Sequence, residues 1–332
     1  MLLIIKSSKN TWWPETRRAN LENMLNIWYK TILSKSFSTT ITNIFKSNTL
    51  ITYSQNLHTI IASFIFHIFN KNHIHVIHGN YYLERQSKKW IKKLFRILFN
   101  LIPIYLSNNL IFPSSYLFEN LSKQSKYFLK HKNKCHIVLN SIDYNNLPKT
   151  RKNKKTIRIL TITNFDFWDK CKWIIEMINW LNIIKSKWST FELNIVWDWI
   201  YFNKVKKSIT KTNFPINWLW YCPDIKKMYI NNDLFFYCSY LDSGPIVILE
   251  AIKYWLTILT NIIWFTDDVI VRNNSFYWIY KTRKEFLNKA SFLLNNTKIY
   301  NDINKLQYNY AKEKTSNDNV FIQRQKIIDD KK

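Results

Sequence analysis

The chain has 332 residues, which at about 150 residues per domain indicates roughly two domains. Hydrophobic residues make up 47% of it and charged residues 21%, so sizeable cores can be buried and a disordered chain is excluded. The net charge of +27 favours an anionic partner, namely nucleic acid, an anionic membrane surface or a phosphorylated substrate, although a codon bias of an AT-rich gene explains the charge equally well. The four cysteines form no Cys-x-x-Cys pair, which argues against a disulfide scaffold and a zinc ribbon.

Short apolar runs alternate with helical patterns along the whole chain. In the first half we expect strands at 2–6, 50–53, 74–77, 109–112 and 136–139, and helices at 15–27, 56–70, 86–102 and 115–123. In the second half we expect strands at 157–163, 192–196, 234–238 and 256–260, and helices at 173–186, 203–210, 226–231, 246–254 and 284–295. Such alternation predicts an α/β protein with parallel sheets and helices on both faces.

The polar segment 144–156 contains Pro148 and is rich in Lys and Arg, which makes it the best linker candidate. The sequence therefore predicts a first domain over residues 1–150 and a second over 151–332, which ends in a polar helix or frayed tail. No apolar run reaches the ~20 residues that cross a bilayer, and the first apolar run is too short for a signal peptide. We expect a soluble or peripheral protein of a reducing cytoplasm.

Glycine and tryptophan have unusual counts in this chain. Only Gly79 and Gly244 occur, where an average usage of about 7% would give roughly 23 glycines, whereas tryptophan occurs 15 times. Tryptophans occupy predicted turns and helix ends, where glycine is favoured because it tolerates positive φ. These positions are Trp12, Trp13, Trp28, Trp173, Trp197, Trp199 and Trp255. Our hypothesis is that most of the tryptophans are UGA codons that the source organism reads as glycine; the alternative is a genuinely tryptophan-rich chain, and Trp218 is a candidate for a true tryptophan.

The segment 238–251 is the strongest candidate for a functional site. A predicted strand ends, a small polar loop follows, and a helix begins at Pro245 and Ile246. The free N–H groups at such a helix start make an anion site next to Ser243 and Gly244. Asp242 and Glu250 are eight residues apart, so Glu250 can accept hydrogen bonds from sugar or ribose hydroxyls. The alternative is an ordinary helix start with a surface glutamate.

This segment resembles the acidic-x7-acidic signature of the family 4 (group 1) glycosyltransferases. The family usually has Glu at both ends, whereas the first acid here is Asp242. The resemblance extends from about residue 1 to residue 300 and implies a GT-B fold, in which two doubly wound Rossmann-like domains face each other across a cleft. It makes the first domain the acceptor side and the second the nucleotide-sugar side.

Further motifs carry the resemblance in the same order as in the family. Trp12 and Trp13 match a Gly-Gly loop that approaches the donor diphosphate, and His78 matches a histidine that faces the interdomain cleft. The segment Lys170-Cys171-Lys172-Trp173 resembles the Lys-Gly pair whose lysine neutralises the diphosphate. Trp199 belongs to a segment like the family's Val-Gly-x-Gly turn, and Asp224 with Ile225 lies in a loop like the one that edges the nucleotide base. The arginine that the family places a few residues earlier is missing from Asn164-Phe165-Asp166-Phe167, and Lys170 is the candidate substitute.

The resemblance implies a retaining, metal-independent hexosyltransferase with no cofactor, which moves a sugar from a nucleotide-diphosphate sugar to a hydroxyl of a cell-surface or lipid-linked glycan. The catalytic residues that it implies are His78, Lys172 and Glu250. The donor-binding residues that it implies are Trp12, Trp13, Lys170, Trp199, Asp224, Ile225, Asp242, Ser243, Gly244, Pro245 and Ile246. We expect a cytoplasmic protein, peripheral on the inner face of the cell membrane, and no nucleic acid partner.

Other functions remain open at this point. The charge and the 17% aromatic content suit a protein that binds single-stranded nucleic acid. A sugar-nucleotide epimerase of the same shape needs carboxylates from both domains, and the first domain offers few. A GT-B scaffold that has lost catalysis fits the missing arginine. His73, His75 and His78 have no acid or cysteine beside them, so a metal site there is a weak hypothesis. The basic helix face Lys88, Lys89, Lys92, Lys93 and Arg96 is either solvated or in contact with an anionic acceptor or lipid.

Overall fold

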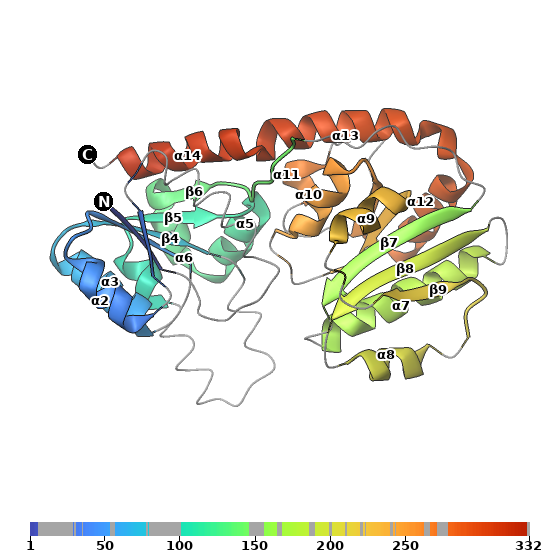
Figure 1. Ribbon diagram of the computed structural model, residues 1–332, viewed down its shortest axis with the longest axis horizontal. Helices are drawn as coiled ribbons and strands as arrows, with labels where there is room; N and C mark the ends of the chain where they lie inside the picture. The colour runs from blue at the N-terminus through green and yellow to red at the C-terminus, as the bar shows by residue number, and fades with distance from the viewer. Residues whose placement is uncertain are drawn as a thin grey trace. The chain divides into compact units, whose positions relative to one another are not determined.

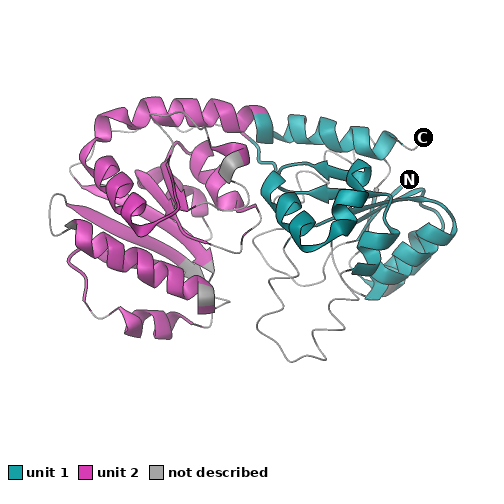
Figure 2. Ribbon diagram, turned by 180° about the vertical axis from the view of Figure 1, so that it is seen from behind, with its two compact units in different colours: residues 1–143, 314–332 teal, residues 144–313 magenta. Residues whose placement is uncertain are grey.

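The protein consists of two compact units, shown in Figure 2. The computed structural model describes residues 1–5, 29, 31–34, 36–53, 57–77, 79, 101–145, 156–164, 168–185, 190–198, 201–209, 211–219, 222, 224–239, 242, 244–261, 266–270 and 278–330. Unit 1 comprises Met1–Asp143 and Lys314–Lys332, and unit 2 comprises Tyr144–Glu313. The units thus divide a few residues before the expected boundary. The C-terminal segment belongs to unit 1, whereas the sequence analysis assigned it to the second domain.

Unit 1 is built on a six-stranded parallel sheet with the order β2-β1-β3-β4-β5-β6. Its strands β4, β5 and β6 are labelled in Figure 1. Its strands are β1 (Leu2–Ile5), β2 (Thr31–Ser34), β3 (Thr49–Thr52), β4 (Asn72–Val76), β5 (Asn109–Phe112) and β6 (Cys135–Ile137). Its helices are α2 (Phe37–Ile44), α3 (Leu57–Ile68), α5 (Ser115–Gln124), α6 (Lys126–Lys130), the 3-10 turn η2 (Lys132–Lys134) and α14 (Asn317–Asp329). The strands β1, β3 and β5 are short, largely apolar runs that are buried on both faces, as in parallel sheets generally, whereas the edge strand β6 is partly exposed.

Helices cover both faces of this sheet. On one face, Leu3 and Leu50 pack against Ala62 and Phe66 of α3. On the other face, Leu2 and Ile51 lie in a cluster with the apolar residues of α14, which are Val320, Phe321, Ile327 and Ile328. The alternation of neighbouring strand residues between the two faces follows from the two-residue period of a strand.

Unit 2 has a second six-stranded parallel sheet, with the order β12-β11-β10-β7-β8-β9. Its strands are β7 (Ile157–Asn164), β8 (Phe191–Asp198), β9 (Ile216–Leu219), β10 (Leu234–Tyr237), β11 (Thr257–Asn261) and β12 (Ile279–Tyr280). Its helices are α7 (Trp168–Lys185), α8 (Phe202–Ser208), α9 (Ile225–Asn231), α10 (Ile246–Lys253), α11 (Thr266–Val269), α12 (Arg283–Asn295), the 3-10 turn η3 (Thr297–Ile299) and α13 (Tyr300–Thr315), which reaches the unit boundary.

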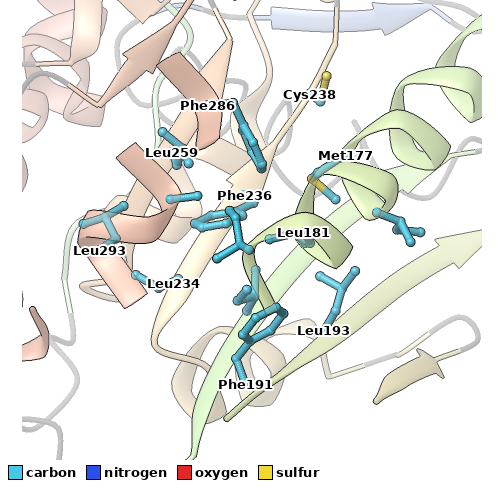
Figure 3. Packing of buried hydrophobic residues seen from close by; sticks show 14 of the residues in the cluster. Met177, Leu181, Phe191, Leu193, Leu234, Phe236, Cys238, Leu259, Phe286 and Leu293 are labelled. Atoms are coloured by element: carbon cyan, nitrogen blue, oxygen red, sulfur yellow. The ribbon is translucent and has the colours of Figure 1, made fainter. Parts of the chain in front are cut away.

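The core of unit 2 lies between this sheet and the helices α7 and α12. Met177 and Leu181 of α7 point toward Phe236 and Leu193 on the strands, and Phe286 of α12 closes the cluster (Figure 3). Each of these side chains is fully buried. Each buried large apolar side chain contributes roughly 1.5–3 kcal/mol to stability, so this cluster stabilises the packing of α7 and α12 on the sheet.

The structure confirms the parallel α/β class and most of the expected strands. It adds β2, β9 and β12, which are short or carry mixed side chains, and the helix α2, which begins after the N-cap Ser36. Two expectations about tryptophan were wrong. Trp173 does not open a helix, because α7 already begins at Trp168, and Trp197 is not in a turn, because β8 continues to Asp198.

Within the described ranges, no helix combines the length and the apolar content that a membrane-spanning segment needs.

Candidate functional site

In the unit 2 sheet, the direction in which successive strands are added reverses between β7 and β10. The chain runs from β7 outward to β8 and β9 on one side, and from β10 outward to β11 and β12 on the other. In an open parallel sheet, ligands bind beyond the carboxyl ends of the strands at such a switch point. The segments that follow β7 and β10 contain Lys170 and Asp242, so the fold alone places these two residues at the favoured position.

Asp242 is held by three side chains at this switch point. The Lys170 ammonium lies 3.0 Å from Asp242 Oδ1. Ser239 Oγ donates a hydrogen bond to Oδ2 at 2.8 Å, and the hydroxyl of Tyr237 donates to the same oxygen. The Lys170 and Asp242 side chains are only 14% and 26% exposed, so this ion pair is largely removed from solvent.

The electrostatics of the cluster keep Asp242 charged. Burial raises the pKa of Asp242. The Lys170 charge and the hydrogen bonds from Tyr237, Lys170 and Ser239 lower it by a larger amount, so the pKa lies below the ordinary value. Burial and the neighbouring Asp242 charge hold the pKa of Tyr237 well above its usual range. Tyr237 therefore stays a neutral donor, and Asp242 stays an anion at neutral pH.

Asn261 fixes the loop that carries Asp242. It is the last residue of β11, and its side chain is almost fully buried. Its Nδ2 donates to the carbonyl of Ser239 at 2.6 Å, and its Oδ1 accepts from the Ser239 N–H at 3.0 Å. Both backbone groups of Ser239 are thus satisfied by one amide, which holds the start of the loop in one conformation.

Glu250 lies in α10, the helix that follows this loop. Its Oε2 accepts a hydrogen bond of 2.7 Å from the hydroxyl of Tyr229, a fully buried residue of α9. Pro245 is the N-cap of α10 and makes no side-chain cap hydrogen bond. The N–H of Ile248 donates to the carbonyl of Pro245 at 3.2 Å, and the anion site at the start of this helix stays a prediction.

The structure separates the two lysines of the Lys-Cys-Lys segment. Both are in α7, two residues apart, so their side chains leave the helix on different sides. Lys170 pairs with Asp242, Cys171 is buried in the core, and Lys172 is exposed. Lys172 is the catalytic cation that the resemblance implies, whereas the described contacts bring Lys170 to the acidic residue.

The remaining predicted donor residues of unit 2 lie at helix starts. Asp224 is the N-cap of α9, and its carboxylate lies 3.3 Å from the ammonium of Lys227. Ile225 opens α9, and Gly244 precedes the cap of α10. Five predicted site residues lie outside the described residues, namely Trp12, Trp13, His78, Trp199 and Ser243.

Sequence reasoning missed four residues that organise this site, namely Tyr229, Tyr237, Ser239 and Asn261. A signal existed for two of them. Tyr237 and Ser239 are two residues apart at a strand end, so they share one side of the chain and point to one place. Tyr229 and Asn261 gave no such signal, because they are far in sequence from the residues that they hold.

His73 and His75, once considered as metal ligands, are buried on β4. Their nitrogens Nε2 and Nδ1 lie 3.0 and 2.8 Å from the hydroxyl of Thr52. Among the residues that the structure describes, there is no group of three or more His, Cys, Asp or Glu side chains that could hold a metal ion.

Comparison with known proteins identifies the family of the chain. A family model described as "Glycosyl transferases group 1" matches residues 144–310, which is half of the chain. No curated protein matches the sequence.

Several solved structures share the fold at low sequence identity. TarM of S. aureus matches with a TM-score of 0.70 and 14% identity, over 88% of this chain and 58% of its own. HepE of Anabaena, solved with UDP and glucose, matches with a TM-score of 0.73 and 11% identity over 99% of both chains. Sucrose-phosphate synthase of Thermosynechococcus elongatus matches with a TM-score of 0.74 and 10% identity over 98% of this chain and 97% of its own. The chain thus spans less than two thirds of TarM, and these likenesses confirm the expected GT-B fold class.

Proposed function

The chain belongs to the group 1 glycosyl transferases, and from this premise we propose that it transfers a hexosyl group from a nucleotide-diphosphate sugar to a hydroxyl acceptor. We further propose that it is of the family 4 type, retains the anomeric configuration and needs no metal or cofactor. The observation that carries the proposal is the pair of Lys170 and Asp242, which lies next to the segment that leads into α10 at the switch point of the unit 2 sheet.

The difficult step of such a transfer is the departure of the nucleoside diphosphate. As the bond between the anomeric carbon and the diphosphate oxygen breaks, negative charge accumulates on the leaving group. Lysine ammonium groups and helix N–H groups that are already oriented stabilise this charge at no cost in reorganisation. Lys170 is held in place by Asp242 and is the proposed cation for these phosphates, whereas Lys172 leaves α7 on another side and is exposed. The oxygen of the acceptor hydroxyl then bonds the anomeric carbon on the face that the diphosphate leaves, and its proton passes to an oxygen of the departing diphosphate.

Glu250 is proposed to bind the hydroxyls of the donor ribose or sugar. The hydrogen bond from Tyr229 occupies its Oε2 and fixes the carboxylate in one rotamer. Asp224 and Ile225 at the start of α9 and Trp199 after β8 would border the nucleotide. From unit 1, the Trp12–Trp13 loop would contact the diphosphate and His78 would orient the sugar or acceptor. The acceptor is proposed to be a cell-surface or lipid-linked glycan, with the enzyme peripheral on the inner face of the cell membrane.

We also propose that most tryptophans of the printed sequence are glycines in the native protein. Trp255 supports this, because its φ of 59° lies in the left-handed region, where a bulky side chain is strained and glycine is not. It directly follows the last turn of α10, the position where glycine is preferred. Its indole Nε1 is buried and has no hydrogen-bond partner in the described part of the chain. Peptide masses of the native protein test the proposal: glycine masses at 197, 199 and 255 are expected, and tryptophan masses there contradict it.

Donor binding tests the proposed function. A thermal-shift screen against UDP-, GDP- and ADP-sugars should show one donor that raises the melting temperature, because a ligand that binds only the folded state stabilises it by mass action. Glu250→Ala should remove this rise in a protein that remains folded, although the loss of the Tyr229 hydrogen bond lowers its own melting temperature somewhat. An exposed acid of the same unit provides the matched control, and Glu176→Ala should keep the full rise. No rise with any sugar nucleotide, or an equal rise in Glu250→Ala, contradicts the proposal.

A further inference from the structure

The outward side of α3 in unit 1 is apolar. Its inward residues Ala62 and Phe66 pack on the sheet, yet Leu57, Phe64 and Ile68 on the other side are 59%, 45% and 73% exposed. Their spacing of seven and four residues places them in one line along the helix. At its end, Phe69 and Phe45 of the preceding α2 segment are 57% and 61% exposed, and their rings meet at 5.9 Å. We call Leu57, Phe64, Ile68, Phe45 and Phe69 the α3 stripe.

This composition is unusual for a helix on the surface of a unit. A surface helix normally carries charged residues on its outer side, whereas α3 contains no Asp, Glu, Lys or Arg. Large apolar side chains that gather on one exposed face mark an interaction surface. Exposed apolar residues that occur singly, such as Leu306 of α13 and Ile322 of α14, need no such explanation.

The sequence around the stripe is basic, and the exposed Glu119 of α5 lies four residues before Lys123. No Asp or Glu occurs between residues 23 and 83, and Lys46, next to Phe45, is exposed. A second basic segment, Lys123 to Lys134, carries five lysines on α5, α6 and η2, and no Asp or Glu occurs between residues 120 and 142. Within it, Leu129 is 57% exposed between exposed lysines. We call residues 123–134 the lysine segment.

The α3 stripe and the lysine segment lie on the same side of the sheet. Leu50 of β3 packs on the α3 side and is in register with His73 of β4, while His75 is in register with Leu110 of β5. Because residues two apart share a face, Leu110 and Phe112 also point to the α3 side. Phe112 contacts Phe128 of α6, with ring centroids 5.7 Å apart. Apolar and basic side chains are therefore carried by one helical layer of unit 1.

We infer that this layer docks on a membrane surface that contains anionic lipid. The α3 stripe would lie in the plane of the interface with its aromatic and aliphatic side chains at the acyl boundary, and the lysine segment would face the lipid phosphates. A second copy of the chain fits less well, because a two-fold contact through this layer would bring the same lysines of both copies together. The inference goes beyond the donor chemistry of unit 2 and gives a surface to the membrane partner proposed above.

Vesicle binding tests the inference independently of catalysis. The full-length chain should co-sediment with vesicles that contain phosphatidylglycerol and bind pure phosphatidylcholine vesicles at least tenfold more weakly. Phe64→Gln with Ile68→Gln should lower binding to phosphatidylglycerol vesicles at least tenfold. Lys126→Gln with Lys130→Gln and Lys132→Gln should lower it and flatten its salt dependence. The matched control, Leu306→Gln with Ile322→Gln, removes two exposed apolar residues elsewhere and should bind like the wild type.

The circular dichroism and melting temperature of each variant show whether it is folded, and a variant that unfolds is replaced by Phe64→Ser alone. Absence of binding to phosphatidylglycerol vesicles by the wild type overturns the inference. Binding that is unchanged in the folded stripe variant also overturns it. A wild-type dimer that the stripe variant converts to a monomer would assign the surface to a second copy and overturn it as well. Donor-induced stabilisation measured in the same samples reports separately on the proposed function.

Discussion

At the scale of single residues, the position and charge of Asp242 are determined by the side chains that bind its carboxylate. Three of the positions at which its carboxylate can accept hydrogen bonds are taken by Lys170, Tyr237 and Ser239. The shorter side chain of Asp, compared with the Glu usual in the family, is thus drawn back toward the strand end. Its proposed role is to hold Lys170 in place, while Glu250 contacts the donor.

Tyr237→Phe tests this role. The ring stays and the fold should be kept, but Asp242 loses a donor, so the pKa of its carboxylate should rise and the acidic limit of activity should move to higher pH. A hydrogen bond to a charged group contributes about 1.5–3 kcal/mol, so kcat/KM should fall about tenfold or more. Tyr300→Phe removes a hydrogen bond of 2.7 Å to a backbone carbonyl in the same unit and serves as the control, with an unchanged pH profile. Identical pH profiles for Tyr237→Phe and the wild type would refute the assignment.

Trp255 offers a prediction about stability. Its positive φ costs roughly 1–2 kcal/mol for a residue other than glycine, so Trp255→Gly in the printed sequence should leave the free energy of unfolding equal or raise it. Trp180 in the middle of α7 packs on Phe286 with ring centroids 5.1 Å apart, and Trp180→Gly should cost about 3 kcal/mol or more. Urea unfolding measures both values. A loss of several kcal/mol in Trp255→Gly would mean that tryptophan belongs at this position.

At the scale of secondary-structure elements, β4 contains a pH-sensitive pair. Burial lowers the pKa of His73 to about 3, with help from the neighbouring His75, and burial lowers the pKa of His75 to about 4. Both pKa values in the folded chain lie below the ordinary value of 6.5. The two histidines therefore cost no stability above pH 6.5, and the free energy of unfolding of unit 1 falls as the pH drops from there toward 4. In this window the unfolded chain binds protons that the folded chain does not.

The free energy of unfolding of unit 1 should therefore fall by about 1.4 kcal/mol per pH unit for each of the two histidines. Urea unfolding between pH 7 and pH 4.5 measures the slope. His75→Gln should reduce the slope by about half, whereas His67→Gln on the exposed side of α3 removes only the smallest of the causes that lower the pKa of His73 and should change the slope much less. Equal slopes in the wild type and His75→Gln would contradict this account of β4.

Much of the element pattern could be predicted from the sequence, and the exceptions have physical reasons. Strands such as β1, β5 and β10 are continuous apolar runs between polar segments, which is why they were predicted within a residue or two. The strand β9 has the sequence Ile-Asn-Trp-Leu and is half-buried, so no run marks it. The start of α7 was misplaced because Trp173 was read as a turn residue, while the buried Cys171, Ile174 and Met177 show that the helical period already includes that segment.

At the scale of the whole molecule, the C-terminal segment belongs to the first unit. Four apolar residues of α14 enter the core of the unit 1 sheet, and Arg324 donates to the hydroxyl of Tyr53 at 2.8 Å. The hydroxyl of Tyr29 donates to Asp329 at 3.1 Å. The docking of α14 on unit 1 could not be predicted from the sequence, because the polar composition of residues 301–332 suggests a tail. The two hydrogen bonds also join residues about 270 or more positions apart.

Removal of residues 314–332 should therefore destabilise unit 1 and leave unit 2 nearly unchanged. Four buried large side chains contribute about 6 kcal/mol or more to unit 1, so its β1 and β3 amides should lose protection against hydrogen exchange. The amides of β8 and β10 serve as the internal control. Loss of protection in unit 2 with none in unit 1 would contradict the assignment of α14.

The acids and the helix start of the candidate site could be predicted because they lie in the one segment 238–251. Its lysine could be predicted because it belongs to the motif Lys170-Cys171-Lys172-Trp173. The residues that hold them in place, Tyr229 and Asn261, come from other elements, and only the order of the parallel strands brings them there.

The most direct measurement is the release of nucleoside diphosphate from sugar nucleotides by the full-length chain, with glycan-lipid acceptor or water present. We predict that one class of sugar nucleotide is consumed with equal amounts of diphosphate released, and that Glu250→Ala reduces this rate at least a hundredfold in a protein that remains folded. Release at the same rate in Glu250→Ala, or no release from UDP-, GDP- or ADP-sugars by the folded native protein, would contradict the conclusion that the unit 2 switch point is the site of glycosyl transfer.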